Sequence, residues 1–90
     1  MLIIKDAKRT RENISRNNYT ARLTFTNNKG ETIAVDSKVF NKGGKAFQWL
    51  IDRMGKACFY GEAVNAQKFN LIIIAPDGTV EDFTIESGED

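Results

Sequence analysis

The sequence predicts a single two-layer α+β domain, in which one helix packs on a mainly antiparallel sheet of four to five strands. Three patterns predict this fold: strict apolar–polar alternation over residues 19–26, an apolar repeat of helical period over 45–58, and an unbroken apolar run over 69–75. The chain has 90 residues, of which 41% are hydrophobic and 28% charged. These values are ordinary for one small globular domain, so we expect residues 1–90 to fold as a unit.

The N-terminal third is predicted to contain a strand, an arm and a second strand. Residues 1–5 are apolar enough for a short strand, whereas residues 6–18 are polar and basic and are expected to form an arm or loop. In residues 19–26 the odd positions are apolar or aromatic and the even positions are threonine or arginine. This alternation is typical of a strand with one face on the core and the other in water.

A hairpin is expected to follow. Residues 27–30 read Asn-Asn-Lys-Gly, and Gly30 can adopt the positive φ that such loops need. The partner strand is predicted over residues 31–36, with Ile33 and Val35 directed inward. Residues 37–44 are predicted to be a connector.

The central segment has the periodicity of a helix, expected from about residue 44 to residue 58. Its apolar stripe consists of residues three and four apart, namely Phe47, Leu50, Ile51, Met54 and Cys58. On this pattern Cys58 is a small buried side chain. A reactive thiol is the alternative, although nothing in the sequence would lower its pKa.

The C-terminal third is predicted to form a second hairpin. Residues 69–75 have the composition of a central strand, and Pro76-Asp77-Gly78 is a tight turn. Residues 79–85 form the last strand, and residues 86–90 an acidic tail. The expected order is therefore β-β-β-α-β-β.

Charge is divided along the chain. Residues 1–56 hold twelve of the thirteen Lys and Arg residues and five of the twelve acids, whereas residues 57–90 hold one and seven. This division predicts a basic region that contacts phosphate or an acidic partner. The candidate anion or nucleic-acid contacts are Lys5, Lys8, Arg9, Arg11, Arg16, Arg22 and Lys42. A solvated loop is the alternative for the residues of the arm.

The segment Lys42-Gly43-Gly44-Lys45 precedes the predicted helix. Glycines let a ligand approach the free N–H groups at a helix start, so this segment is a candidate anion site. It lacks the spacing of a phosphate-binding P-loop. A loop with solvated lysines is the alternative.

Trp49 is the clearest candidate for a partner contact. At 100° per residue it lies on the opposite side of the helix from Phe47, among Lys45, Arg53 and Lys56. Tryptophan and arginine dominate the energetic centres of protein interfaces, so these four residues form a candidate partner-binding set. The alternative is that the 6–18 arm or the 59–68 loop covers the tryptophan.

Several kinds of chemistry have no support in the sequence. The chain has no histidine and one cysteine, so it lacks the commonest general base and cannot build a zinc site from these two residue types. We expect no catalytic residues, no metal and no cofactor. No apolar run is long enough for a signal peptide or a membrane span, so we expect a cytoplasmic protein without membrane contacts.

The function predicted from the sequence is a non-catalytic protein-binding module, monomeric or homodimeric. Small charged proteins without enzyme signatures are common among phage and mobile-element inhibitors, including anti-CRISPR proteins, although no motif in this chain carries that resemblance. The alternative is a nucleic-acid-binding protein that uses the basic N-terminal half. The absence of aromatic residues interleaved with these charges argues against stacking on single-stranded bases.

Overall fold

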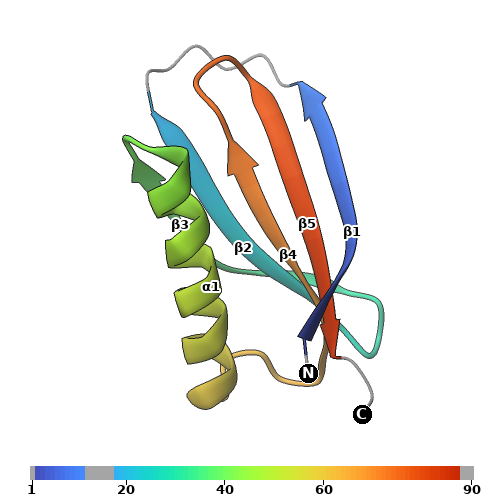
Figure 1. Cartoon of the computed structure of the whole chain (residues 1–90). Coiled ribbons are helices and arrows are strands. Elements are labelled where there is room, and N and C mark those ends of the chain that lie inside the picture. The colour runs from blue at the N-terminus through green and yellow to red at the C-terminus, as the bar shows by residue number, and fades with distance from the viewer. Residues whose placement is uncertain (1, 12–17, 88–90) are drawn as a thin grey trace.

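The computed structural model describes the backbone of residues 2–11 and 18–87 and the side chains of residues 18–86. Its elements follow the order β-β-β-α-β-β (Figure 1). They are β1 (Leu2–Arg11), β2 (Tyr19–Asn27), β3 (Thr32–Phe40), α1 (Gly43–Phe59), β4 (Ala66–Ile74) and β5 (Thr79–Ser87). The strands form one antiparallel sheet of order β1-β5-β4-β2-β3, with α1 on one face over β2, β3 and β4. The predicted α+β class is confirmed.

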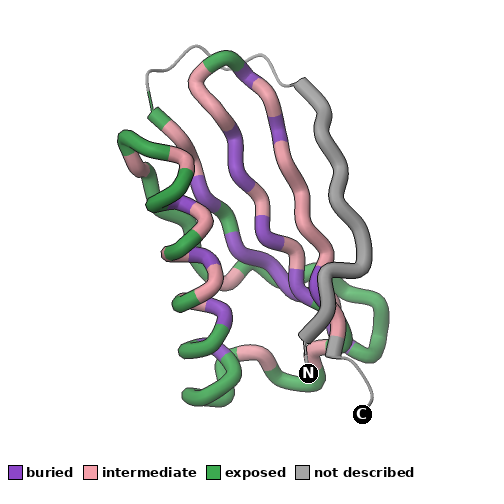
Figure 2. Tube along the Cα trace, viewed as in Figure 1, coloured by how far each residue is buried: buried purple, intermediate pink, exposed green. Residues whose placement is uncertain are grey.

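The core lies between α1 and the two central strands (Figure 2). The helix buries Ala46, Leu50, Met54 and Ala57, which recur at spacings of three and four along one line. From the sheet, β2 and β4 contribute alternate residues, namely Ala21, Leu23, Phe25, Phe69, Leu71 and Ile73. Small alanines at both ends of the helical line allow α1 to lie close to the sheet along its length.

The buried line of the helix differs from the predicted stripe. Cys58 was expected to be buried, but it is exposed. The predicted stripe omitted the alanines, and the true line runs through Ala46 and Ala57. Cys58 is turned about 100° away from Ala57, so it leaves the sheet side of the helix.

Both outer strands are longer than the sequence predicts. Residues 6–11, expected in an arm or loop, continue β1, which pairs with β5. Residues 12–17 of the predicted arm and residues 88–90 of the predicted tail lie outside the described residues. β3 extends to Phe40 through residues expected in the connector, and Ile33 is 41% exposed rather than directed inward.

The register explains these differences in β3. Leu23 pairs with Asp36 and Thr24 with Ala34, so Val35 is an extra residue that forms a β-bulge. β3 is an edge strand, and only Val35 and Phe40 within it are even partly buried. Because an edge strand needs no apolar alternation, the C-terminal half of β3 is polar, and its sequence therefore resembled that of a connector.

The face of β2 that points away from α1 is less exposed to solvent than the alternation in the sequence indicated. Arg22 is exposed, but Thr24 is only 8% exposed, between Ala34 of β3 and Asn70 of β4. Asn70 in turn donates hydrogen bonds to Asp82 and Thr84 of β5, each 3.0 Å long. Neighbouring strands thus shield the middle of this face. Among the residues that the structure describes, no helix is both long enough and apolar enough to cross a lipid bilayer.

Candidate protein-binding surface

One side of α1 carries the residues that the sequence predicts to bind a partner. Lys45, Trp49, Arg53 and Lys56 are spaced by four, four and three residues, so they share this side, and Tyr60 at the end of the helix continues it. The side faces the edge strand β3, to which Trp49 and Arg53 make contacts.

Trp49 is half-buried and packs against the core. Its ring lies against Phe40 at the end of β3, with centroids 5.7 Å apart and planes tilted by 52°. Lys38 Nζ lies 5.5 Å from the centroid of the same Phe40 ring. The sequence left open whether Trp49 is exposed or covered by the chain, and in the structure it is partly covered. The described ring contact comes from Phe40, a residue that the sequence did not suggest as a cover.

Arg53 connects α1 to two other segments. Its Nε donates to Asp36 Oδ2 in β3 at 2.9 Å, and its Nη1 donates to Glu62 Oε1 in the loop after the helix. The Arg53 guanidinium lowers the pKa of the Asp36 carboxyl and of the Glu62 carboxyl, chiefly through these hydrogen bonds. The two carboxylates raise the pKa of Arg53 in return. Arg53 therefore ties β3, α1 and the following loop together.

Replacing Arg53 with methionine is expected to reduce stability in a pH-dependent way. The pKa values of both carboxyl groups are lower in the folded state than in the unfolded state. The two ion pairs therefore stabilise the fold fully above the unfolded pKa values of about 4, and this stabilisation is lost as the pH falls through the folded pKa values. The urea midpoints of the wild type and Arg53→Met should therefore differ most near pH 7 and converge toward pH 2. Lys56→Met, which removes a cation from the same side, is the control and should show no such convergence. A pH-independent difference for Arg53→Met would contradict the ion-pair role.

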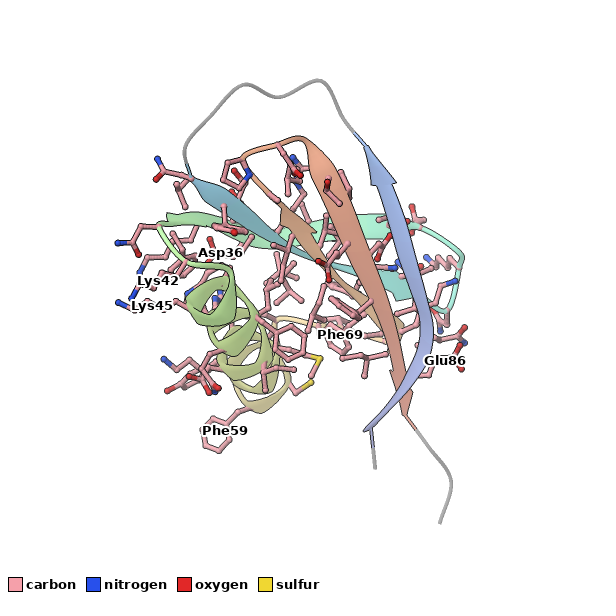
Figure 3. The ribbon with its side chains drawn as sticks, turned by 45° about the horizontal axis from the view of Figure 1, so that its top comes forward. Asp36, Lys42, Lys45, Phe59, Phe69 and Glu86 are labelled. Carbon is pink, nitrogen blue, oxygen red and sulfur yellow. The ribbon has the colours of Figure 1, made fainter. Side chains whose placement is uncertain are left out.

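The C-terminal end of α1 and the loop after it expose three large apolar side chains, here together called the aromatic end: Phe59, Tyr60 and Val64. Their exposed fractions are 81%, 70% and 63%. The Phe59 and Tyr60 rings meet edge to face with centroids 5.1 Å apart, and Phe59 projects beyond the helix in Figure 3. Both rings lie at the surface, and neither was predicted as a site residue. The signal for them in the sequence is their position directly after the apolar stripe of the helix.

The local backbone fixes how the aromatic end is presented. Tyr60 N–H donates to the Lys56 carbonyl at 2.9 Å, and Gly61 follows with φ +74°, a conformation that ends helices and favours glycine. Glu62, one residue later, is held by Arg53. The two rings are thus attached to an ordered helix end rather than to a free loop.

The N-terminal end of α1 carries exposed lysines. Lys42 and Lys45 are both exposed, and Figure 3 shows them at the same end of the helix. No side chain caps this end, and no acidic residue occupies the first turn. A Cβ at Gly43 would lie 3.1 Å from the Tyr19 ring, so this glycine has a packing role of its own. Anion binding at this segment stays a prediction.

The charged segments at the two ends of the chain lie next to each other. In the backbone register of β1 and β5, Lys8 is opposite Asp82 and Arg9 is opposite Glu81. Among the other candidate anion contacts, Arg11 is opposite Thr79, Lys5 lies at an irregularity of β1, and Arg16 lies outside the described residues. The basic strand therefore runs beside the acidic one in this register, and anion contact by the basic residues stays a prediction.

A shallow groove of about 360 Å³ lies between the start of α1 and the sheet. Its lining is mainly apolar and includes Tyr19, Phe47, Ile73, Ala75 and Phe83. The Phe47 and Phe83 rings form one wall, with centroids 5.4 Å apart. Sequence reasoning did not identify the groove, because it depends on how β5 lies relative to the helix.

Within residues 18–86, no three His, Cys, Asp or Glu side chains gather in a way that could hold a metal ion. In comparisons with known proteins, the chain matches no protein-family model, no curated protein and no solved structure.

Proposed function

We propose that this protein is a non-catalytic protein-binding module whose central contact is the aromatic end of α1. The observation that carries the proposal is the exposure of two adjacent aromatic rings, Phe59 at 81% and Tyr60 at 70%. Exposed apolar clusters of this kind are typical of protein-interaction sites, and aromatic residues dominate the binding energy of interfaces. Burying these rings against a partner would remove apolar surface from water.

Two features of the aromatic end support this role. The rings are attached to a helix end that Arg53 braces through Glu62, so binding would order few groups and lose little entropy. Lys56 lies one turn before Tyr60 and is exposed, which places a cation beside the rings. Lys45 and the accessible part of Trp49 extend the same side of the helix, so we propose that the predicted set flanks the central contact.

The partner that suits this surface is a protein with an apolar pocket and acidic residues at its rim. An inhibitor of the kind found in phages and mobile elements is the narrower form of this proposal, in which the contact blocks a partner's working surface. The nucleic-acid alternative gains no support from the β1–β5 register, which places Lys8 and Arg9 beside acidic residues.

The proposal is tested by changing Phe59 and Tyr60 together to alanine. A partner would first be identified by affinity capture from the cells that make the protein, and then purified for measurement of its Kd. We expect the double variant to bind at least about thirtyfold more weakly, the loss typical of an interface centre. Its melting temperature should remain within a few degrees of the wild type, because neither ring is part of the core.

Ile33→Ala is the matched control. It removes an exposed apolar side chain from another part of the surface, so its Kd should equal that of the wild type. Wild-type affinity in the Phe59/Tyr60 variant would overturn the proposal. A partner that proves to be nucleic acid would also overturn it. Such a partner would be identified by a binding affinity that falls steeply as the salt concentration increases.

A further inference from the structure

We propose that two copies of this chain pair through the outer edges of their β3 strands, antiparallel about Ser37, and join their sheets into one. The inference does not depend on the proposed function, because it concerns Ser37 and its neighbours in β3, whereas the proposed function concerns the aromatic end at the C-terminus of α1. The partner is a second copy because this edge is complementary to itself.

No described strand covers the outer edge of β3, and the Ser37 N–H at its centre donates to its neighbour Asp36 Oδ1 at 2.8 Å, a local hydrogen bond that strand pairing would replace. β3 is the last strand in the sheet order, its inner edge pairs with β2, and no described strand pairs with its outer edge. β3 is nine residues long, and seven of these residues are exposed. The N–H and C=O groups along such an edge are a ready template for another strand.

The charges around Ser37 complement each other in a two-fold arrangement. If Ser37 faces Ser37 of the second copy, Asp36 faces Lys38 of that copy, and the reverse contact follows by symmetry. Asp36 and Lys38 pair in register with Leu23 and Ala21, two core residues on the helix side of β2. The facing charges therefore lie on the same face of the joined sheet, at the separation of a directly opposed cross-strand pair.

The same charges exclude the neighbouring registers. A pairing centred on Lys38 would place two lysines directly opposite each other, and a pairing centred on Asp36 would do the same with two aspartates. Charged residues and a bulge are common means of protecting an edge from unwanted strands. In this protein the bulge at Val35 limits the regular segment of β3 to Asp36–Phe40. The charges of Asp36 and Lys38 in this segment favour pairing with the same edge of a second copy over pairing with the edge of another protein.

Residues beside the edge can add to this contact. Val39 is 55% exposed, and the partly exposed Phe40 and Trp49 rings lie at the end of the same regular segment. Both copies of α1 would lie on the same face of the joined sheet, because the two-fold axis is perpendicular to it. The paired segment is short, so we expect a weak dimer with a Kd on the order of micromolar.

Sedimentation velocity over a range of protein concentrations tests the proposal. The wild type should shift from one to two chain masses as concentration rises. Lys38→Asp and Asp36→Lys should each remain monomeric, because each places like charges opposite one another. The double variant Asp36→Lys/Lys38→Asp should dimerise again, because lysine then faces aspartate. Mixing the two single variants should give a heterodimer, since one strand is then wholly basic and the other wholly acidic.

Two controls separate charge pairing from misfolding and from net charge. Lys29→Asp makes the same change of charge in the β2–β3 loop and should dimerise like the wild type. Asp36→Lys also removes a hydrogen-bond partner of Arg53, so the melting temperature of this variant is measured. Formation of a heterodimer in the mixture with Lys38→Asp would show that the Asp36→Lys variant is folded. A wild type that stays monomeric, or single variants that dimerise normally, would overturn the proposal. Loss of dimer in Phe59→Ala/Tyr60→Ala, with Lys38→Asp unaffected, would assign the self-contact to the aromatic end instead.

Discussion

Replacing Leu23 with alanine is expected to lower the free energy of unfolding by about 3–5 kcal/mol. Leu23 is fully buried in β2, between Asp36 of β3 and Leu71 of β4, on the face that packs against α1. The truncation would leave a cavity in the centre of the sheet, where neighbours on both sides are held by strand pairing. Because small domains have unfolding free energies of about 5–15 kcal/mol, urea denaturation followed by circular dichroism should show a large shift.

Two further substitutions serve as controls for Leu23→Ala. Leu23→Met nearly conserves volume and should cost less than about 1.5 kcal/mol. Thr24→Ala changes the other face of the same strand and should cost about 1 kcal/mol, although Thr24 is only 8% exposed, because few atoms are removed. If Thr24→Ala were as damaging as Leu23→Ala, the face opposite α1 would contribute as much to the core as the helix face does.

Replacing Trp49 with alanine is expected to cost about 2–3 kcal/mol of stability. Loss of a large buried aromatic side chain costs about 3–5 kcal/mol, and the half-exposed position of Trp49 reduces this value. The contact with Phe40 should appear in a double-mutant cycle with Phe40→Ala as a coupling of about 1 kcal/mol.

Phe59→Ala is the matched control for Trp49→Ala, since it removes an aromatic side chain that is almost entirely exposed. Its stability should change by less than about 0.5 kcal/mol. The opposite pattern, in which Trp49→Ala retains full stability and loses partner binding, would restore Trp49 to the anchor role that the helical periodicity alone predicts.

The fold class could be predicted because its central elements are periodic. β2 shows its buried side as alternate residues, and α1 and β4 show apolar patterns of the length expected for a helix and a central strand. The edges were less predictable for a physical reason. β3 and the second half of β1 lie at the margins of the sheet, where pairing with one neighbour is enough and no apolar pattern is required.

The candidate surface was predicted only in part, because its key contacts join distant residues. The sequence identified Arg53, but its partners Asp36 and Glu62 lie 17 and 9 residues away and have no recognisable spacing. Trp49 was placed by its angle on the helix, whereas its burial depends on Phe40 at the end of the preceding strand. The exposure of both Phe59 and Tyr60 depends on where the helix passes the end of the sheet.

The sheet order has a consequence for how the chain assembles during synthesis. Of the five strands, residues 2–11 are synthesised before the others, and the strand that pairs with them, residues 79–87, is synthesised after the others. Meanwhile β2 can pair with β3 across a short loop, and β4 with β2 once α1 has formed. Because segments far apart in the sequence meet slowly, we expect β1 to be the last strand to join the sheet. We therefore expect the helix-covered unit of β2, β3 and β4 to form before β1 joins the sheet.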